Sequence, residues 1–205
     1  MRQELRAFRR KGLNKRQAQI VGELENVVQG SSVLEIGCGV GAISTTLLRK
    51  GARVGHYVEI SSDYLEAARE IAEDAGVSEK ATFHLDDFAA AKTHYASANI
   101  VVLDRVVCCY PDGIKLIAKA ARHSERYLVY TYPRPLWFIR VFKAMLGFTM
   151  RLFRQDYRFF LHDPEKLSQA VSEAGHVLVV TRAIGLWQLV VLSKGIDPIT
   201  LTVGS

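Results

Sequence analysis

Short apolar runs alternate with helical patterns along most of this 205-residue chain. An apolar run of about five residues, bounded by glycine or polar residues, is typical of a strand buried on both faces of a sheet. Strands that alternate with helices indicate a largely parallel sheet with helices on both faces. Such strands are predicted over residues 32–36, 53–59, 81–85, 99–103 and 127–132.

Helical patterns fill the intervals between these runs. The last helix has the clearest boundaries, because Asp163 supplies an N-cap, Pro164 occupies the first helical position and Gly175 follows the final turn. The predicted helices cover residues 14–29, 41–50, 63–75, 113–122 and 164–174, and residues 1–29 as a whole form a basic, helical N-terminal segment.

Two further strands are predicted near the C-terminus, over residues 177–183 and 187–193. They are joined by a short turn that contains Gly185, and a short turn forces antiparallel pairing. We therefore expect one α/β domain over residues 1–205, with a seven-stranded, mostly parallel sheet that ends in an antiparallel hairpin.

The composition is that of an ordinary globular protein, with 49% hydrophobic and 23% charged residues. A membrane-spanning helix is not expected, because no run of about 18 apolar residues occurs, and the N-terminus lacks the apolar stretch of a signal peptide. Cys38, Cys108 and Cys109 lack the number and spacing of a disulfide framework or a zinc site. We expect a cytoplasmic protein with reduced thiols and no bound metal.

The formal net charge of +6 is unevenly distributed. Residues 1–16 carry seven basic side chains and one acid, and residues 134–158 carry six basic side chains and one acid, so the rest of the chain is acidic. This distribution either serves solubility or attracts an anionic substrate, a membrane or a nucleic acid.

Residues 134–160, after the fifth predicted strand, form a basic and aromatic insert. Its basic side chains would lie within an arc of about 80° on one helix, with apolar side chains opposite. The favoured interpretation is a lid helix over an apolar pocket, in which Trp137 and Phe138 contact a hydrophobic small molecule, with an anionic group as an open alternative. The rival is reversible docking on anionic membranes. The basic residues of the stripe are Arg140, Lys143, Arg151, Arg154 and Arg158.

The segment EIGCGVG, residues 35–41, joins the first predicted strand to the next helix. Its alternate glycines allow positive φ and a close approach of the backbone to a ligand, and the start of the helix adds free N–H groups. The spacing departs from the dinucleotide pattern G-x-G-x-x-G, and Glu35 would repel a pyrophosphate. A cofactor with a cationic amino group suits this acid better.

Polar residues also follow the next three strands. Glu59 ends the second strand, 18 residues after Gly41, and an acid there can accept hydrogen bonds from ribose hydroxyls. The segment LDDF, residues 85–88, ends the third strand, and Asp104 and Arg105 follow the fourth. The carboxyl ends of parallel strands border the ligand in such sheets, so we expect these side chains at one site.

Residues 35–41 closely resemble motif I of class I S-adenosylmethionine-dependent methyltransferases, E/D-x-G-x-G-x-G. The segments after the next three strands resemble those of the same family, and the segment after the fourth resembles small-molecule members such as the magnesium-protoporphyrin O-methyltransferases. The resemblance covers residues 30–132, and the C-terminal hairpin in outline. It implies a Rossmann-like fold, S-adenosylmethionine as cofactor and S-adenosylhomocysteine as product.

The resemblance also implies roles for single residues. Gly37 and Gly39 approach the methionine portion of the cofactor, and Glu35 helps to fix its amino end. Asp87 aligns with the acid that binds the adenine amino group, but Asp86 replaces the usual glycine, so the choice between these carboxylates stays open. Phe88 packs on the adenine or in the core. The predicted cofactor-binding residues are Glu35, Gly37, Cys38, Gly39, Gly41, Glu59, Ile60, Asp87, Phe88 and Asp104.

Methyl transfer is an in-line displacement in which the enzyme mainly supplies alignment and a dry, shaped site. A general base matters only when the acceptor must lose a proton. His162 precedes a capped helix, so its ring either enters the pocket or is a surface or capping residue, and His84 is expected in the core or at the sheet edge. The candidate catalytic residues are Asp104, Arg105, Tyr110 and His162, with Tyr132 as a further possibility.

The expected function is methyl transfer to oxygen, nitrogen or carbon of a small, largely apolar molecule. An RNA methyltransferase is an alternative, since the basic segments suit phosphates. It is less favoured, because these residues do not form a known RNA-binding module and no Asn/Asp-Pro-Pro-Tyr motif follows the fourth strand. A non-catalytic module that retains the cofactor pocket is the third hypothesis. Neither the acceptor atom nor the oligomeric state follows from the sequence.

Overall fold

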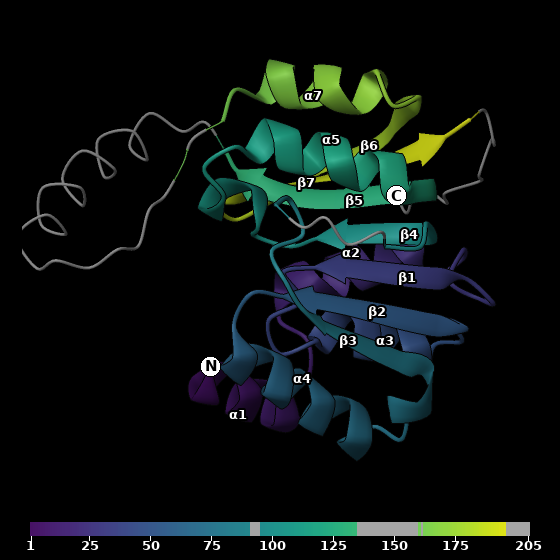
Figure 1. Ribbon diagram of the computed structural model, residues 1–205, viewed down its shortest axis with the longest axis vertical. Helices are drawn as coiled ribbons and strands as arrows, with labels where there is room; N and C mark the ends of the chain where they lie inside the picture. The colour runs from purple at the N-terminus through teal and green to yellow at the C-terminus, as the bar shows by residue number, and fades with distance from the viewer. Residues whose placement is uncertain (91–94, 135–159, 161, 196–205) are drawn as a thin grey trace, which may run out of the picture.

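In the computed structural model, residues 1–90, 95–134, 160 and 162–195 are described. Within them, seven strands form one sheet in the order β3-β2-β1-β4-β5-β7-β6 (Figure 1). The first five strands along the chain pair in parallel, and β7 is antiparallel to both of its neighbours. The strands are β1 (Ser32–Ile36), β2 (Val54–Glu59), β3 (Ala81–Leu85), β4 (Ala98–Leu103), β5 (Ser124–Pro133), β6 (His176–Ile184) and β7 (Trp187–Lys194).

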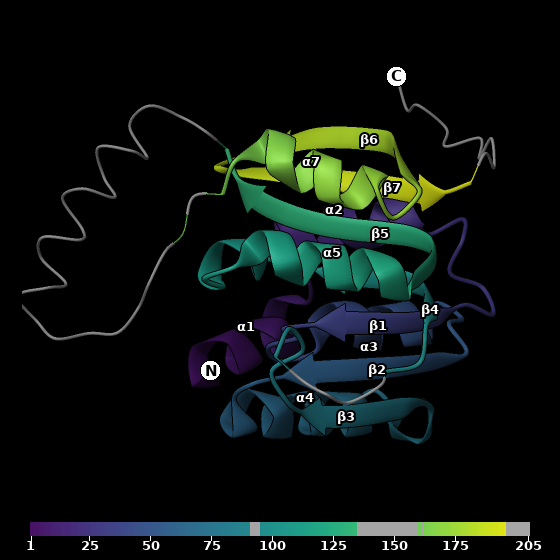
Figure 2. The ribbon, with the colours of Figure 1, turned by 45° about the horizontal axis from the view of Figure 1, so that its top comes forward.

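Helices cover both faces of this sheet, with α5 and α7 together on one of them (Figure 2). The side chains of α2, α3 and α4 pack on the other face. The predicted α/β fold with its C-terminal antiparallel hairpin is therefore confirmed. The helices are α1 (Arg2–Lys11), α2 (Lys15–Leu24), α3 (Ala42–Arg49), α4 (Ser62–Asp74), α5 (Gly113–His123) and α7 (Pro164–Ser172), with short 3-10 helices η1 (Ser78–Lys80) and η2 (Val107–Cys109).

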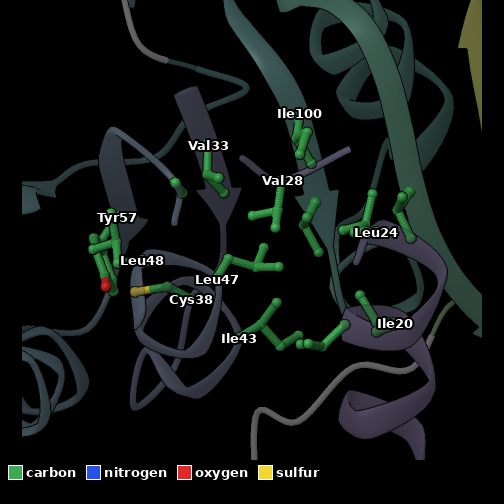
Figure 3. Close-up of a cluster of buried hydrophobic side chains, with 14 of the residues drawn as sticks. Ile20, Leu24, Val28, Val33, Cys38, Ile43, Leu47, Leu48, Tyr57 and Ile100 are labelled. Atoms are coloured by element: carbon green, nitrogen blue, oxygen red, sulfur yellow. The ribbon is translucent and has the colours of Figure 1, made fainter. Parts of the chain in front are cut away.

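The core consists of two apolar layers, one on each face of the sheet. Figure 3 shows one of them, in which Ile20 and Leu24 of α2 gather with Leu47 of α3 around Val33 and Ile100. Each of these side chains is almost completely buried, and burial of such a side chain stabilises the fold by about 1.5–3 kcal/mol. Because both faces of the sheet are covered, its central strands are apolar on both faces. This is why short apolar runs such as residues 99–103 predicted strands in the sequence.

The helix predicted over residues 14–29 is wrong at its end, because α2 ends at Leu24. A capping box starts the helix, with the side chain of Asn14 accepting from the backbone N–H of Gln17 at 3.1 Å. After Leu24 the chain makes tight-turn bonds, such as that from the Val27 N–H to the Leu24 carbonyl. Val28 is still buried from within the loop, so the apolar pattern continues beyond the helix.

The N-terminal segment contains a separate helix, α1, which lies against α4. Leu5 is its buried residue and packs with Ala67 and Ile71 of α4. On the exposed side, Arg9 forms ion pairs with Glu70 at 3.0 Å and with Asp74 at 2.8 Å. The basic residues of this segment are therefore partly used in a contact between two helices.

The helix predicted after Asp163 is present. The Asp163 side chain accepts from the Glu165 N–H at 3.0 Å, and Pro164 begins α7. The lid predicted over residues 134–160 lies outside the described residues, except for Arg134 and Phe160. No helix in the described part of the chain has the length and apolarity needed to cross a membrane.

The start of α3 is a site where packing tolerates only glycine. Gly41 has a φ of 72°, and a Cβ atom there would lie 2.8 Å from Tyr57 and 3.0 Å from Ala68. Gly76, after α4, has a φ of 67° with no atom within 4 Å of such a Cβ. The two glycines thus separate the cost of backbone strain from the cost of overpacking.

We expect Gly76→Ala to lower the free energy of unfolding by about 1–2 kcal/mol through strain alone. Gly41→Ala should lower it by about 2–5 kcal/mol, because overpacking adds to the strain. Urea denaturation of both variants and the wild type measures the difference. Equal losses in the two variants would contradict the packing of Gly41 against β2 and α4.

Candidate functional site

A cavity of about 600 Å³ opens beside the carboxyl ends of β1, β2, β3 and β4. The loop after β1 and the ends of β2 and β3 form one part of its wall, and the segment after β4 forms another. Helices α1 and α2 contribute a third part, with residues that include Glu4, Phe8, Arg16 and Gln17. Residues from the first 17 positions thus complete a site whose other walls follow the strands.

The loop after β1 lies directly against the segment after β4. Gly37 and Gly39 have φ values of 66° and 54°, which favour glycine. A Cβ atom on Gly37 would lie 2.5 Å from a methyl carbon of Val106, so any side chain at this position would push the two segments apart. The bare backbone of Gly37 therefore forms part of the cavity wall.

Glu59 ties the end of β2 to this loop. One of its carboxylate oxygens accepts from the Gly39 N–H at 2.9 Å, and the other accepts from Ile60 at 2.9 Å and Ser61 at 3.1 Å. Glu59 is only 8% exposed, yet it borders the cavity. An ionised carboxylate has about four acceptor positions, so one remains for a ligand.

Glu35 is buried beneath the loop and accepts from the Ser44 N–H at 2.9 Å. Burial is the main cause that raises the pKa of this carboxyl to about 8; the Ser44 hydrogen bonds oppose it, and the nearby Asp104 and Glu59 add to it. The group is therefore largely protonated at neutral pH. A cation placed beside it would favour the ionised form and release that proton.

Two carboxylates follow β3 and both border the cavity. Asp87 accepts from the backbone N–H of Ala89 at 3.0 Å and from the hydroxyl of Tyr110 at 3.2 Å. Asp86 accepts from the hydroxyl of Tyr95 at 2.7 Å. The structure thus leaves the sequence-based choice between Asp86 and Asp87 open.

The apolar residues near these acids differ in exposure. Ile60 is 69% exposed at the rim of the cavity, an unusual position for a large aliphatic side chain. Phe88 is 3% exposed and packs on Tyr95, with the ring centroids 5.1 Å apart. Ile60 is therefore available to a ligand, whereas Phe88 belongs mainly to the core.

Asp104 forms an ion pair that the sequence analysis did not predict. Its two oxygens accept from Arg16 of α2 at 2.6 and 2.9 Å, and one of them also accepts from the hydroxyl of Thr131 at 2.8 Å. The pair is largely buried. Because Arg16 lies 88 positions before Asp104, its only signal in the sequence was its place in a basic segment.

The structure brings most of the predicted site residues to the cavity. Among the predicted cofactor residues, Gly41 is the exception, since it packs beneath the loop. Asp104, Arg105 and Tyr110 border the cavity, whereas His162 does not. The Nε2 atom of His162 lies 3.0 Å from the Tyr110 carbonyl oxygen. The cofactor residues that do border the cavity are Glu35, Gly37, Cys38, Gly39, Glu59, Ile60, Asp87, Phe88 and Asp104.

Two other ring residues lie outside the cavity wall. His84, in β3, is half-buried with its ring edge-on to Tyr95 at 5.4 Å, which agrees with a place at the edge of the core. Tyr132 is half-buried in β5 and stacks with Tyr130 at 6.0 Å. Neither residue, in this arrangement, faces a ligand in the cavity.

Residues 33–126 match a family model described as a methyltransferase domain. The chain is 30% identical over 94 residues to a dimethylglycine N-methyltransferase of Parasynechococcus marenigrum, covering 46% of this chain and 34% of that protein. It is 28% identical over 108 residues to a ubiquinone biosynthesis O-methyltransferase of Actinobacillus pleuropneumoniae, covering 51% of this chain and 46% of that protein. The chain thus spans less than half the length of either relative.

Solved structures extend the likeness to the fold of most of the chain. Magnesium protoporphyrin IX methyltransferase from Synechocystis PCC 6803, solved with bound S-adenosylhomocysteine, has a TM-score of 0.73 at 18% identity, covering 88% of this chain and 82% of that one. An O-methyltransferase family protein from Burkholderia thailandensis has a TM-score of 0.71 at 18% identity, covering 90% and 57%. Residues 33–126 of this chain therefore resemble a methyltransferase domain, and the chain has the Rossmann-like α/β fold of these methyltransferase structures.

Proposed function

We propose that this chain transfers a methyl group from S-adenosylmethionine to a small, largely apolar acceptor. The observation that carries the proposal is the cavity itself, in which a side-chain-free loop at Gly37 and Gly39 stands beside the carboxylates of Glu35, Glu59 and Asp87. A bare backbone and acids arranged in this way suit a cofactor with a ribose, an amino group and a positively charged sulfur. The structures of magnesium protoporphyrin IX methyltransferase, solved with bound S-adenosylhomocysteine and S-adenosylmethionine, support the same cofactor.

The residues at the cavity fit the parts of this cofactor. Glu59 would hold the ribose with its remaining acceptor position, and Ile60 would cover one side of the adenine. Asp86 or Asp87 would accept from the adenine amino group. Gly37 and Gly39 would border the methionine portion, with Glu35 near its amino end. When bound, the cofactor supplies a methyl group on a sulfonium, which is electrophilic without further activation.

The side chains at this site favour alignment over proton transfer. Asp104 is a poor general base, because Arg16 and Thr131 occupy its oxygens. Burial and the neighbouring Asp87 raise the pKa of Tyr110, so its hydroxyl keeps its proton at neutral pH and donates a hydrogen bond to Asp87. We infer that the protein accelerates transfer mainly by positioning two reactants and excluding water.

We propose a small-molecule acceptor because the names of similar proteins specify small molecules. The names of three of them specify dimethylglycine, a step of ubiquinone biosynthesis and magnesium protoporphyrin IX. The walls provided by Phe8, Val106 and Leu116 add apolar surface to the cavity, as expected for a largely apolar acceptor.

Incubation of the protein with S-adenosylmethionine carrying a tritiated methyl group, together with a fractionated cell extract, tests the activity. We expect label in the low-mass, organic-soluble fraction. Label in the RNA fraction would replace the proposed acceptor class with RNA. Absence of any labelled product, in protein that binds S-adenosylhomocysteine, would indicate a non-catalytic module.

Substitution of Glu59 tests the placement of the cofactor. Glu59→Gln should weaken the binding of S-adenosylhomocysteine by about 10- to 100-fold, since a hydrogen bond to a charged group contributes about 1.5–3 kcal/mol. Calorimetry measures the affinity, with Glu73→Gln on the exposed side of α4 as a matched control that should bind normally. Unchanged affinity in Glu59→Gln would remove Glu59 from the cofactor site.

The raised pKa of Glu35 predicts a proton release. A cationic amino group near Glu35 lowers that pKa from its value of about 8, so a proton leaves the protein on binding. At about pH 6.5 we expect release of about half a proton or more per cofactor. Calorimetric enthalpies in buffers of different ionisation enthalpy measure it, and Glu35→Gln should abolish the release. Equal enthalpies in all buffers for the wild type would contradict this placement of the amino group.

A further inference from the structure

Charge is distributed unevenly around the cavity. The acids Glu35, Glu59, Asp86 and Asp87 line it at the ends of β1, β2 and β3. The segment after β4 and the start of α2 instead contribute two arginines, Arg16 and Arg105, against one acid, Asp104. A cationic ligand suits the first part of the wall, and an anionic ligand suits the second.

Arg105 has an unusual backbone conformation. Its φ of 65° makes it, among the described residues, the one non-glycine residue with a positive φ. Its N–H donates to the Thr131 hydroxyl at 2.8 Å, and that hydroxyl donates to Asp104. Arg16 donates to the same carboxylate. Strain of this kind persists where the surroundings enforce it, often at functional sites.

Trp187 provides a platform for both guanidinium groups. The Cζ atom of Arg105 lies 5.5 Å from the centroid of the indole, and that of Arg16 lies 5.4 Å from it. Trp187 begins β7 and pairs with Pro133 of β5, which places it in the antiparallel part of the sheet. An arginine stacked on an aromatic ring keeps its donors free for a planar carboxylate.

The two arginines differ in whether a carboxylate neutralises their positive charge. Asp104 neutralises Arg16 through two hydrogen bonds. The Arg105 side chain has no carboxylate within 4.0 Å in the described part of the chain, and the residue is exposed. Glu4 also lines the cavity, but its carboxylate lies beside the Tyr64 hydroxyl. Arg105 thus brings an uncompensated positive charge to the cavity.

We propose that Arg105 binds a carboxylate of the methyl acceptor, so that the site selects acidic molecules with an apolar body. This inference rests on the proposed methyl transfer. The cofactor has a carboxylate of its own, which is the second possible source of the same chemistry. The acceptor is favoured because Arg105 is exposed, whereas Glu35, the residue assigned to the amino end of the cofactor, is buried.

The test uses three probes with the same eight-carbon tail: octanoate, octanol and octylamine. We expect the full chain to bind octanoate about tenfold or more tightly than either of the others. Arg105→Gln should reduce the affinity for octanoate to that for octanol. Arg53→Gln, an exposed residue before the amino end of β2, removes the same charge and should leave the preference intact.

Two measurements give the affinities. Calorimetry reports them directly, and the fluorescence of Trp187 reports whether a probe reaches the stacked indole. The chain has two tryptophans, so the part of the fluorescence change that is lost in Trp187→Phe belongs to the stacked indole. Equal affinity of the wild type for octanoate and octanol would overturn the proposal, as would an unchanged preference in Arg105→Gln.

Titration with S-adenosylhomocysteine separates the two sources of the carboxylate. Arg105→Gln should bind it within about twofold of the wild type, because the proposal gives Arg105 no contact with the cofactor. A loss of tenfold or more, which corresponds to a lost interaction of about 1.4 kcal/mol, would overturn the proposal and assign Arg105 to the carboxylate of the cofactor. Failure of the wild type to bind S-adenosylhomocysteine would instead contradict the proposed function. The two failures can be distinguished, because the octanoate titrations do not require the cofactor.

Discussion

The carboxylate of Glu59 is the interaction on which the geometry of the site depends. By accepting backbone N–H groups from the loop after β1 and from the start of the segment after β2, it holds two chain reversals at a common edge. The parallel sheet brings these reversals close together, but it does not set their distance. A buried, charge-assisted set of hydrogen bonds does so, and the contact between Gly37 and Val106 repeats the constraint on the side of β4.

Much of the fold could be read from the sequence, because strands buried on both faces leave continuous apolar runs. The same edge of the sheet then gathers the residues at the carboxyl end of each strand, which is why Glu35, Glu59 and Asp87 could be placed beside the cavity from the sequence. Asp104 was placed at this edge as well, but its partner was not. The ion pair with Arg16 joins positions 88 residues apart, and local patterns hold no information on such a contact.

Other limits of the sequence have local physical causes. The helix end at Leu24 was missed because Val28 continues the apolar pattern from a turn. His162 precedes a helix cap, as expected, but its ring turns to the Tyr110 carbonyl and packs over Gly113. A side-chain direction of this kind depends on tertiary contacts. The positive φ of Arg105 was also missed, because no sequence pattern indicates a strained backbone at a non-glycine residue.

Helix α1 closes part of the cavity with little attachment of its own. It contributes Glu4 and Phe8 to the wall, yet its buried anchor is Leu5 and its ion pairs to α4 are exposed to water. Exposed pairs contribute little to stability, because water and salt screen them. Detachment of this helix therefore costs less free energy than unfolding of the sheet. Native proteins open first at such weakly attached elements. Exchange of ligands with the solvent can thus proceed by local fraying of the first eleven residues while both apolar layers stay intact.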